Sequence, residues 1–218
     1  MSSSSPSSLR EKDLRCLVVR CIRRIKLRAV SMRVAVLVGA VCKDISAAAR
    51  LASIAAKGWL ISCTIAADIR PLDSRGLKAN VEPVLLDMGR PAQVRACVGG
   101  WKPDAIVHLA TVIRPPRDMT EAHLHAIEVG GTQCLVDSAL ANGVRQLIVA
   151  SSGAAYGYAA DNAEWIDEDQ PLRGHPYFAY AKHKLEIEQL LARCREQHPQ
   201  LRQLVLRPGT ILGKRLNN

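Results

Sequence analysis

From Met32 onward, short apolar segments alternate with segments of helical periodicity, and this alternation limits the possible folds more than any other feature of the sequence. It predicts strands at 33–38, 60–66, 82–86, 104–109, 146–150 and 203–207, and helices at about 45–57, 91–99, 120–141 and 178–196. Runs such as "DAIVHLA" and "QLIVASS" lack strict polar alternation, as strands buried on both faces do. We therefore expect an α/β fold, a doubly wound parallel sheet with helices on both faces.

The first 31 residues differ in composition from the rest of the chain. They begin with the Ser-rich "MSSSSPSSLR", and apolar residues then recur at helical spacing among arginines and lysines from Leu14 to Arg28. This pattern predicts a basic extension, either disordered or an amphipathic helix that lies on a membrane surface, binds a partner or directs transit. An accidental extension before a natural start at Met32 is equally compatible. We expect a single domain over 32–218.

The charge and the cysteines exclude several classes of function. The net charge is +10, but residues 1–33 hold nine Arg or Lys and two acids, a net +7, which leaves +3 for the other 185 residues. The main body therefore has no basic stripe for nucleic acid. No apolar run is long enough for a membrane span. The seven cysteines form no C-x-x-C pair, which favours reduced thiols, no metal site and a cytoplasmic location.

One predicted helix carries a Tyr and a Lys at a spacing that chemistry can use. In "HPYFAYAKHKLEIEQLL", Tyr180 and Lys184 lie four residues apart and therefore on one helical face. Tyr177 has Ala181 at the corresponding place. The spacing favours Tyr180 over Tyr177 as a catalyst, although such pairs also occur by chance on helices.

Four segments in consistent order resemble the extended short-chain dehydrogenase/reductase family, the NAD-dependent epimerases and dehydratases. They are "DAIVHLAT" at 104–111, "GTQCLVDSALANGVRQLIVASSGAAYG" at 131–157, "YAKHKLEIEQLL" at 180–191 and "LVLRPGTILG" at 204–213. The resemblance implies a Rossmann-like, NAD(P)-binding domain over 32–218. It also implies NAD, with NADP as an alternative, hydride transfer to or from a nucleotide sugar or a related hydroxyl or carbonyl compound, and a possible homodimer through 120–141 and 178–196.

The resemblance assigns the catalytic roles to Ser152, Tyr180 and Lys184. Tyr180 would be the general acid/base, and Ser152 would hydrogen-bond the reacting oxygen. A free phenol has a pKa near 10, so Lys184 and the nicotinamide would favour the phenolate and lower that value. Lys184 would also bind the cofactor ribose.

Further residues are assigned to the cofactor by the same resemblance: Gly39, Asp68, Asp87, Leu109, Ala110 and Pro208, together with Tyr180 and Lys184. Asp68 closes the second predicted strand, where a carboxylate can accept both ribose hydroxyls and favour NAD. The neighbouring Arg70 can accommodate the phosphate of NADP. His108, within the fourth strand motif, is expected to be a packed, satisfied histidine rather than a catalyst.

Three departures from the family pattern leave the function open. In "VLVGAVCKDISAAARLA", Gly39 fits the first glycine of the cofactor loop, but Cys42 replaces the second and Asp44 adds a charge near the diphosphate. Glu128 replaces an Asn behind the active site, and the chain stops where the family continues into a substrate lobe. The sequence thus supports an oxidoreductase, or a catalytically silent Rossmann-like binding or regulatory module. A third hypothesis is an interaction protein that acts through the basic extension.

Overall fold

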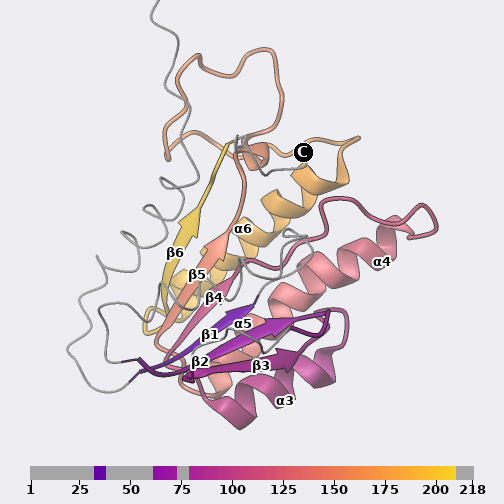
Figure 1. Cartoon of the computed structure of the whole chain (residues 1–218). Helices are drawn as coiled ribbons and strands as arrows, with labels where there is room; N and C mark the ends of the chain where they lie inside the picture. The colour runs from indigo at the N-terminus through magenta and orange to yellow at the C-terminus, as the bar shows by residue number, and fades with distance from the viewer. Residues whose placement is uncertain (1–31, 38–60, 73–78, 210–218) are drawn as a thin grey trace, which may run out of the picture.

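The computed structural model describes residues 32–37, 61–72 and 79–209, whose strands form one six-stranded parallel sheet (Figure 1). The strands are β1 (Met32–Leu37), β2 (Ile61–Asp68), β3 (Val81–Leu85), β4 (Ala105–His108), β5 (Gln146–Ala150) and β6 (Arg202–Leu206). Their order is β3-β2-β1-β4-β5-β6, so the direction of winding changes between β1 and β4. Doubly wound sheets bind ligands at that change, outside the carboxyl ends of the strands. The predicted α/β fold is confirmed.

The described helices α3, α5 and α6 cover one face of this sheet (Figure 1). The helical segments are α3 (Pro91–Trp101), α4 (Glu121–His125), the π-helical turn η1 (Ala126–Gly130), α5 (Gly131–Ala141), the 3₁₀ turn η2 (Gly153–Tyr156) and α6 (Ala179–Gln197). The predicted helix at 120–141 is therefore one helical run that contains a π turn. The predicted helix at about 45–57, the loop with Gly39, Cys42 and Asp44, and the extension 1–31 lie outside the described residues.

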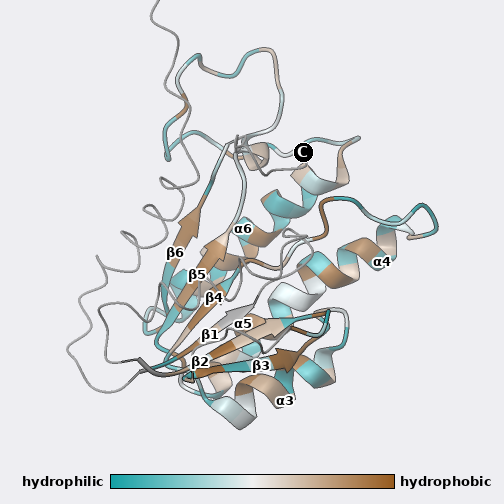
Figure 2. Ribbon diagram, in the orientation of Figure 1, coloured by the Kyte–Doolittle hydropathy of each residue, from teal (hydrophilic) through white to brown (hydrophobic). Residues whose placement is uncertain are grey.

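The core lies between the central strands and the helices. All four residues of β4 and the first four of β5 are buried, as expected for parallel strands covered on both faces. Ile106 and Leu147 pack in one cluster with Leu135 of α5 and Leu191 of α6, all fully buried. Figure 2 shows the hydrophobic colour running along β4, β5 and β6. Each such side chain contributes about 1.5–3 kcal/mol by its burial, which fixes the strand ends against the helices.

Local signals in the sequence set several element boundaries. Pro91 occupies the first turn of α3, where its missing N–H removes no helical hydrogen bond. The Thr120 hydroxyl caps α4 by accepting a hydrogen bond from the His123 N–H at 3.2 Å. No helix among the described residues is long and apolar enough to cross a membrane. The cysteines of the described part, Cys63, Cys97, Cys134 and Cys194, are free thiols.

Two adjacent glycines at the start of α5 have opposite surroundings. A Cβ added to Gly131 would lie 2.7 Å from the backbone oxygen of Met88, so α5 packs directly on the turn after β3. A Cβ added to Gly130 would meet nothing within 4 Å. Only Gly131 is therefore required by packing.

We expect Gly131→Ala to lower the free energy of unfolding by about 1–3 kcal/mol, because a backbone carbonyl cannot yield to the added methyl group. Gly130→Ala is the matched control and should be neutral or stabilising by about 0.5–1 kcal/mol, since alanine favours the helix. Chemical denaturation of both variants measures the difference. Equal stabilities would show that the close approach of α5 to Met88 does not exist.

His108, the last residue of β4, is buried and neutral. Its Nε2 lies 3.0 Å from Thr132 Oγ1, which already donates its proton to the Glu128 carbonyl at 2.6 Å. The Nε2–H of His108 is therefore the donor, and its buried Nδ1 has no hydrogen-bond partner among the described residues. Burial, and secondarily the charge of Lys184, lowers the pKa of His108 to about 3. The expected packed histidine is confirmed, but only one of its two nitrogens is satisfied.

This neutral histidine should make the fold sensitive to acid. Between the unfolded pKa of about 6.5 and the folded value of about 3, the unfolded chain binds the extra proton, so stability falls as the pH falls through this window. The loss is about 1.4 kcal/mol per pH unit, or about 2 kcal/mol between pH 6.5 and 5. We expect His108→Gln to weaken this fall of the unfolding free energy with pH, as measured by urea denaturation at pH 6.5 and pH 5. His123→Gln, at an exposed histidine of α4, should leave the fall unchanged. An unchanged fall in His108→Gln would contradict the assignment.

Candidate active site

The residues singled out from the sequence follow the strands of the sheet. Asp68 ends β2, Asp87 lies two residues after β3, Leu109 and Ala110 follow β4, Ser152 follows β5, and Pro208 lies two residues after β6. Because the carboxyl ends of parallel strands meet at one edge of the sheet, all of these residues belong to that edge. Gly39 lies outside the described residues.

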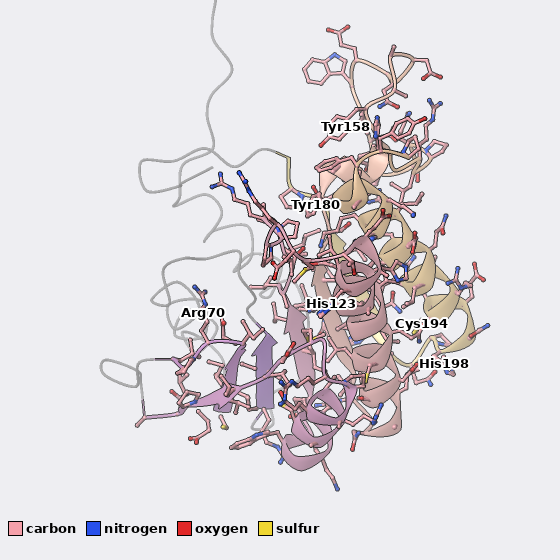
Figure 3. All side chains as sticks on the ribbon, turned by 90° about the vertical axis from the view of Figure 1, so that its right-hand side faces the viewer. Arg70, His123, Tyr158, Tyr180, Cys194 and His198 are labelled. Carbon is pink, nitrogen blue, oxygen red and sulfur yellow. The ribbon has the colours of Figure 1, made fainter. Side chains whose placement is uncertain are left out.

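The structure brings Ser152, Tyr180 and Lys184 together. Tyr180 and Lys184 lie one turn apart near the start of α6, and Lys184 Nζ is 5.4 Å from the centre of the Tyr180 ring. Ser152 Oγ accepts a hydrogen bond from the Ala154 N–H at 3.1 Å, and Ser152 lies close enough to Tyr180 to oppose the rise that burial causes in the pKa of its phenol. Figure 3 shows Tyr180 at the same end of α6 as Tyr158, whereas Cys194 and His198 lie toward the other end. The three side chains therefore lie near one another at the carboxyl edge of the sheet.

The Tyr180 phenol is less acidic than a free one. Burial raises its pKa, the hydrogen bond with Ser152 lowers it, and the charges of Glu128 and Tyr158 raise it further. The net direction is upward, so the phenol is protonated at neutral pH. The lowering expected from Lys184 and a nicotinamide is not produced by the chain on its own.

Lys184 is buried, with its ammonium between the end of β5 and a carboxylate. Its Nζ donates to the Ala150 carbonyl at 3.5 Å and lies 3.8 Å from Glu128 Oε2. Burial lowers the pKa of Lys184, while the negative charges of Glu128 and Glu188 oppose that effect. A buried ammonium needs a compensating anion. Among the described residues, Glu128 is the carboxylate that forms an ion pair with Lys184.

Glu128, which departs from the family's Asn, belongs to the network behind the site. It lies in η1, and its buried carboxylate accepts a hydrogen bond from Thr111 Oγ1 at 2.9 Å and another from the Val112 N–H. These donors follow Leu109 and Ala110 in the segment after β4. Glu128 therefore links that segment to Lys184 and adds a buried anion to the network.

A second buried ion pair, which sequence reasoning missed, holds the ends of β5 and β6 to α6. Arg207, directly before Pro208, donates to Glu188 through Nε at 3.0 Å and Nη2 at 2.7 Å. Ser151 donates to Glu188 Oε1 at 2.5 Å. Because these contacts join residues that are far apart in the chain, no local sequence motif predicts them. They fix the backbone directly before Ser152 and directly before Pro208.

Two of the other tyrosines, Tyr156 and Tyr177, make contacts of their own. Tyr156 donates its hydroxyl proton to the Asp167 carbonyl at 2.9 Å and accepts from Arg207 Nη1 at 2.7 Å, so it is a structural residue. Tyr177 is 93% exposed and packs edge-on against the His175 ring. Tyr180 is therefore the tyrosine that the structure supports as the candidate acid/base.

The two acids that the resemblance assigns to the cofactor, Asp68 and Asp87, each face an arginine. The Asp68 carboxylate is buried, accepts the Arg70 N–H at 2.9 Å and faces Arg70 Nε at 3.5 Å. Asp87 accepts the Gly89 N–H at 2.8 Å and faces Arg90 Nε at 3.4 Å, so it shapes the turn into α3. A buried acceptor at the end of β2 fits ribose hydroxyls. The segment that would meet the pyrophosphate is not among the described residues.

The comparisons with known proteins agree with this architecture. The model of the NAD-dependent epimerase/dehydratase family matches residues 62–218. No curated protein sequence matches the chain significantly.

Three solved structures illustrate the similarity of the fold. UDP-glucose 4-epimerase from Brucella ovis, in complex with NAD, is 22% identical with a TM-score of 0.63. The enzyme WbmH from Bordetella bronchiseptica, in complex with NAD+, is 20% identical with a TM-score of 0.66. A short-chain dehydrogenase/reductase superfamily protein from Agrobacterium tumefaciens, with bound NAD, is 25% identical with a TM-score of 0.60.

These alignments use most of this chain but only part of the other proteins. They cover 81%, 87% and 80% of this chain and 51%, 59% and 48% of the three structures, in the same order. The chain thus spans about half the length of the structures that it matches. The family model matches well over half of the sequence, and the chain belongs to the NAD-dependent epimerase/dehydratase family.

Proposed function

We propose that the chain is an NAD-dependent oxidoreductase of the epimerase/dehydratase type, which acts on a nucleotide sugar or a related hydroxyl or carbonyl compound. The observation that carries this proposal is the meeting of Ser152, Tyr180 and Lys184 at the carboxyl edge of the sheet. Further support comes from the solved neighbours, which include UDP-glucose 4-epimerases in complex with NAD. The cytoplasm as its compartment and a homodimer through α4, α5 and α6 are part of the same proposal.

In this proposal the chain's own residues hold the cofactor and move the proton. The Asp68 carboxylate accepts the ribose hydroxyls at one end, and Leu109 and Ala110 line the path from β4 toward Lys184. A bound NAD would supply the acceptor for a hydride and, once reduced, the donor. Tyr180 takes the proton of a substrate hydroxyl as that carbon is oxidised, and returns it when a carbonyl is reduced.

Ser152 and Lys184 assist that proton transfer. Because the Ser152 Oγ already accepts from Ala154, its own proton is available to the reacting oxygen. The phenol is protonated at neutral pH, which suits the donation of a proton to a carbonyl. The reverse step needs the phenolate, and the buried ammonium of Lys184 is the nearby cation that can stabilise it.

A catalytically silent Rossmann-like binding or regulatory module is the second candidate. Two features favour it: Cys42 and Asp44 in place of the usual glycine-rich sequence, and the Glu128 carboxylate that faces Lys184. Such a module would keep the fold and lose the cofactor. Binding of NAD therefore discriminates between the two candidates.

The proposal predicts that Tyr180→Phe loses hydride transfer by about 10²–10⁴-fold, because the proton has no other positioned carrier. Binding of NAD should be retained, since the ring and Lys184 remain. Hydride transfer is measured with a panel of nucleotide sugars, by the absorbance change as enzyme-bound NAD is reduced. Binding of NAD is measured by calorimetry. Tyr177→Phe, which removes an exposed hydroxyl three residues away, is the matched control. Activity in Tyr180→Phe equal to that of the control would refute the role of Tyr180.

A further inference from the structure

Glu128 is a buried carboxylate close to Lys184, which lies one turn from Tyr180. The reaction proposed above assigns no role to Glu128. It is 6% exposed and lies in a π-helical turn, a feature that often occurs at functional positions. Its carboxylate is held by Thr111 and Val112 on one side and lies 3.8 Å from Lys184 Nζ on the other. Two hydrogen-bond donors and one ammonium thus surround this carboxylate.

The other ionisable groups around Tyr180 and Lys184 are already committed. Burial lowers the pKa of His108 of β4 to about 3 and also lowers the pKa of His183 of α6, whereas Glu188 of α6 is bound by Arg207 and Ser151. Tyr158, from the segment after η2, also acts on Tyr180, but less than Glu128 does. Among the described residues, Glu128 is therefore the anion that compensates the Lys184 ammonium.

We propose that Glu128 is a positioning residue whose carboxylate competes with the Tyr180 phenolate for the Lys184 ammonium, so that the phenolate forms only at a more alkaline pH. A lysine one turn from a tyrosine can promote the phenolate only to the extent that its charge is not neutralised by another anion. The effect on turnover rests on the proposed function. The competition between the two anions is a property of the chain itself.

The directions of the pKa shifts agree with this geometry. Burial is the main cause of the raised pKa of Tyr180 and of the lowered pKa of Lys184, and the Glu128 charge adds to the first shift and opposes the second. A charge within about 4–6 Å shifts a pKa by about 1–3 units. Removal of the Glu128 charge should therefore make the phenol more acidic both by ending a direct repulsion and by releasing the ammonium.

Glu128→Gln is a clean variant because it removes the charge and keeps the shape. The amide oxygen can still accept from the Val112 N–H, and the amide nitrogen can donate to Thr111 Oγ1, whose hydroxyl can rotate to accept. Two controls isolate the charge effect. Glu186→Gln removes a carboxylate from α6, the helix of Tyr180 and Lys184, where Glu186 contacts His125, and Thr111→Val removes a hydrogen bond of Glu128 but no charge.

The test is an ultraviolet titration of the phenols in the full chain. The chain has four tyrosines, so the difference between each protein and its Tyr180→Phe form gives the titration of Tyr180 alone. Glu128→Gln should move the Tyr180 midpoint down by about one pH unit or more, while Glu186→Gln and Thr111→Val leave it in place. An unchanged midpoint in Glu128→Gln would overturn the proposal. An equal downward shift in Thr111→Val would also overturn it, because the effect would then be structural.

A second comparison separates this competition from direct repulsion of the phenolate by Glu128. Lys184→Met and the double variant Glu128→Gln/Lys184→Met both lack the ammonium. The proposal predicts that loss of the Glu128 charge lowers the Tyr180 midpoint less in this background than in the presence of Lys184, and an equal fall would overturn it. Where Glu128→Gln does not fold, Glu128→Asn, which places the family's residue at this position, removes the same charge and should also lower the midpoint. An unchanged midpoint in that variant would overturn the proposal.

These titrations need neither cofactor nor turnover, so they are independent of the proposed function. If the chain is an enzyme, the alkaline limb of its pH–rate profile should move down with the phenol in Glu128→Gln. A shifted phenol in a chain without hydride transfer would support the competition and refute only the proposed activity.

Discussion

The in-register parallel pairing of β4, β5 and β6 is the constraint on which the rest of the site depends. His108 lies opposite Val149, and Ala150 lies opposite Leu206. Because β4 and β5 are buried on both faces, a shift of one residue between them would expose apolar side chains, so their ends are fixed relative to one another. Ser152 and Arg207 therefore leave the sheet side by side, and α6 can contact both strand ends through Lys184 and Glu188.

Two buried ion pairs tie α6 to that edge. Glu188 binds Arg207 after β6, and Lys184 faces Glu128 in the helical run between β4 and β5. Breaking a buried pair by removal of one partner costs about 3–5 kcal/mol, so each pair constrains the position of α6 strongly. The second pair differs from the first because its cation also lies beside the Tyr180 ring. The same contact that positions Lys184 therefore determines how much of its charge is available to the phenol.

Much of the fold and part of the site could be predicted from the sequence. Continuous apolar runs gave β5 at the predicted residues and β4 within one residue at each end, because buried parallel strands have few alternatives. The four-residue spacing identified the helical face shared by Tyr180 and Lys184. The π turn at 126–130 could not be predicted, since it depends on the packing of two helical segments. Nor could the Arg207–Glu188 pair, whose residues are far apart and carry no motif.

The direction of the Tyr180 pKa shift shows where such prediction ends. The spacing to Lys184 suggested a lower pKa, but burial and the Glu128 charge act in the opposite direction, and both depend on tertiary structure. Glu128 was visible in the sequence as a departure from the family, while its ion pair with Lys184 was not.

The central claim is that the carboxyl edge of this sheet binds NAD, and the most direct test is the thermal midpoint of the purified chain with and without NAD. At about 100 times its dissociation constant, a ligand adds about 2.7 kcal/mol to stability. For a chain of this size this corresponds to a rise of about 5–10 °C. We expect such a rise, and a smaller one in Asp68→Asn, which weakens the acceptor for the ribose hydroxyls. A chain that melts cooperatively at the same temperature with and without NAD would contradict the claim and favour the silent module.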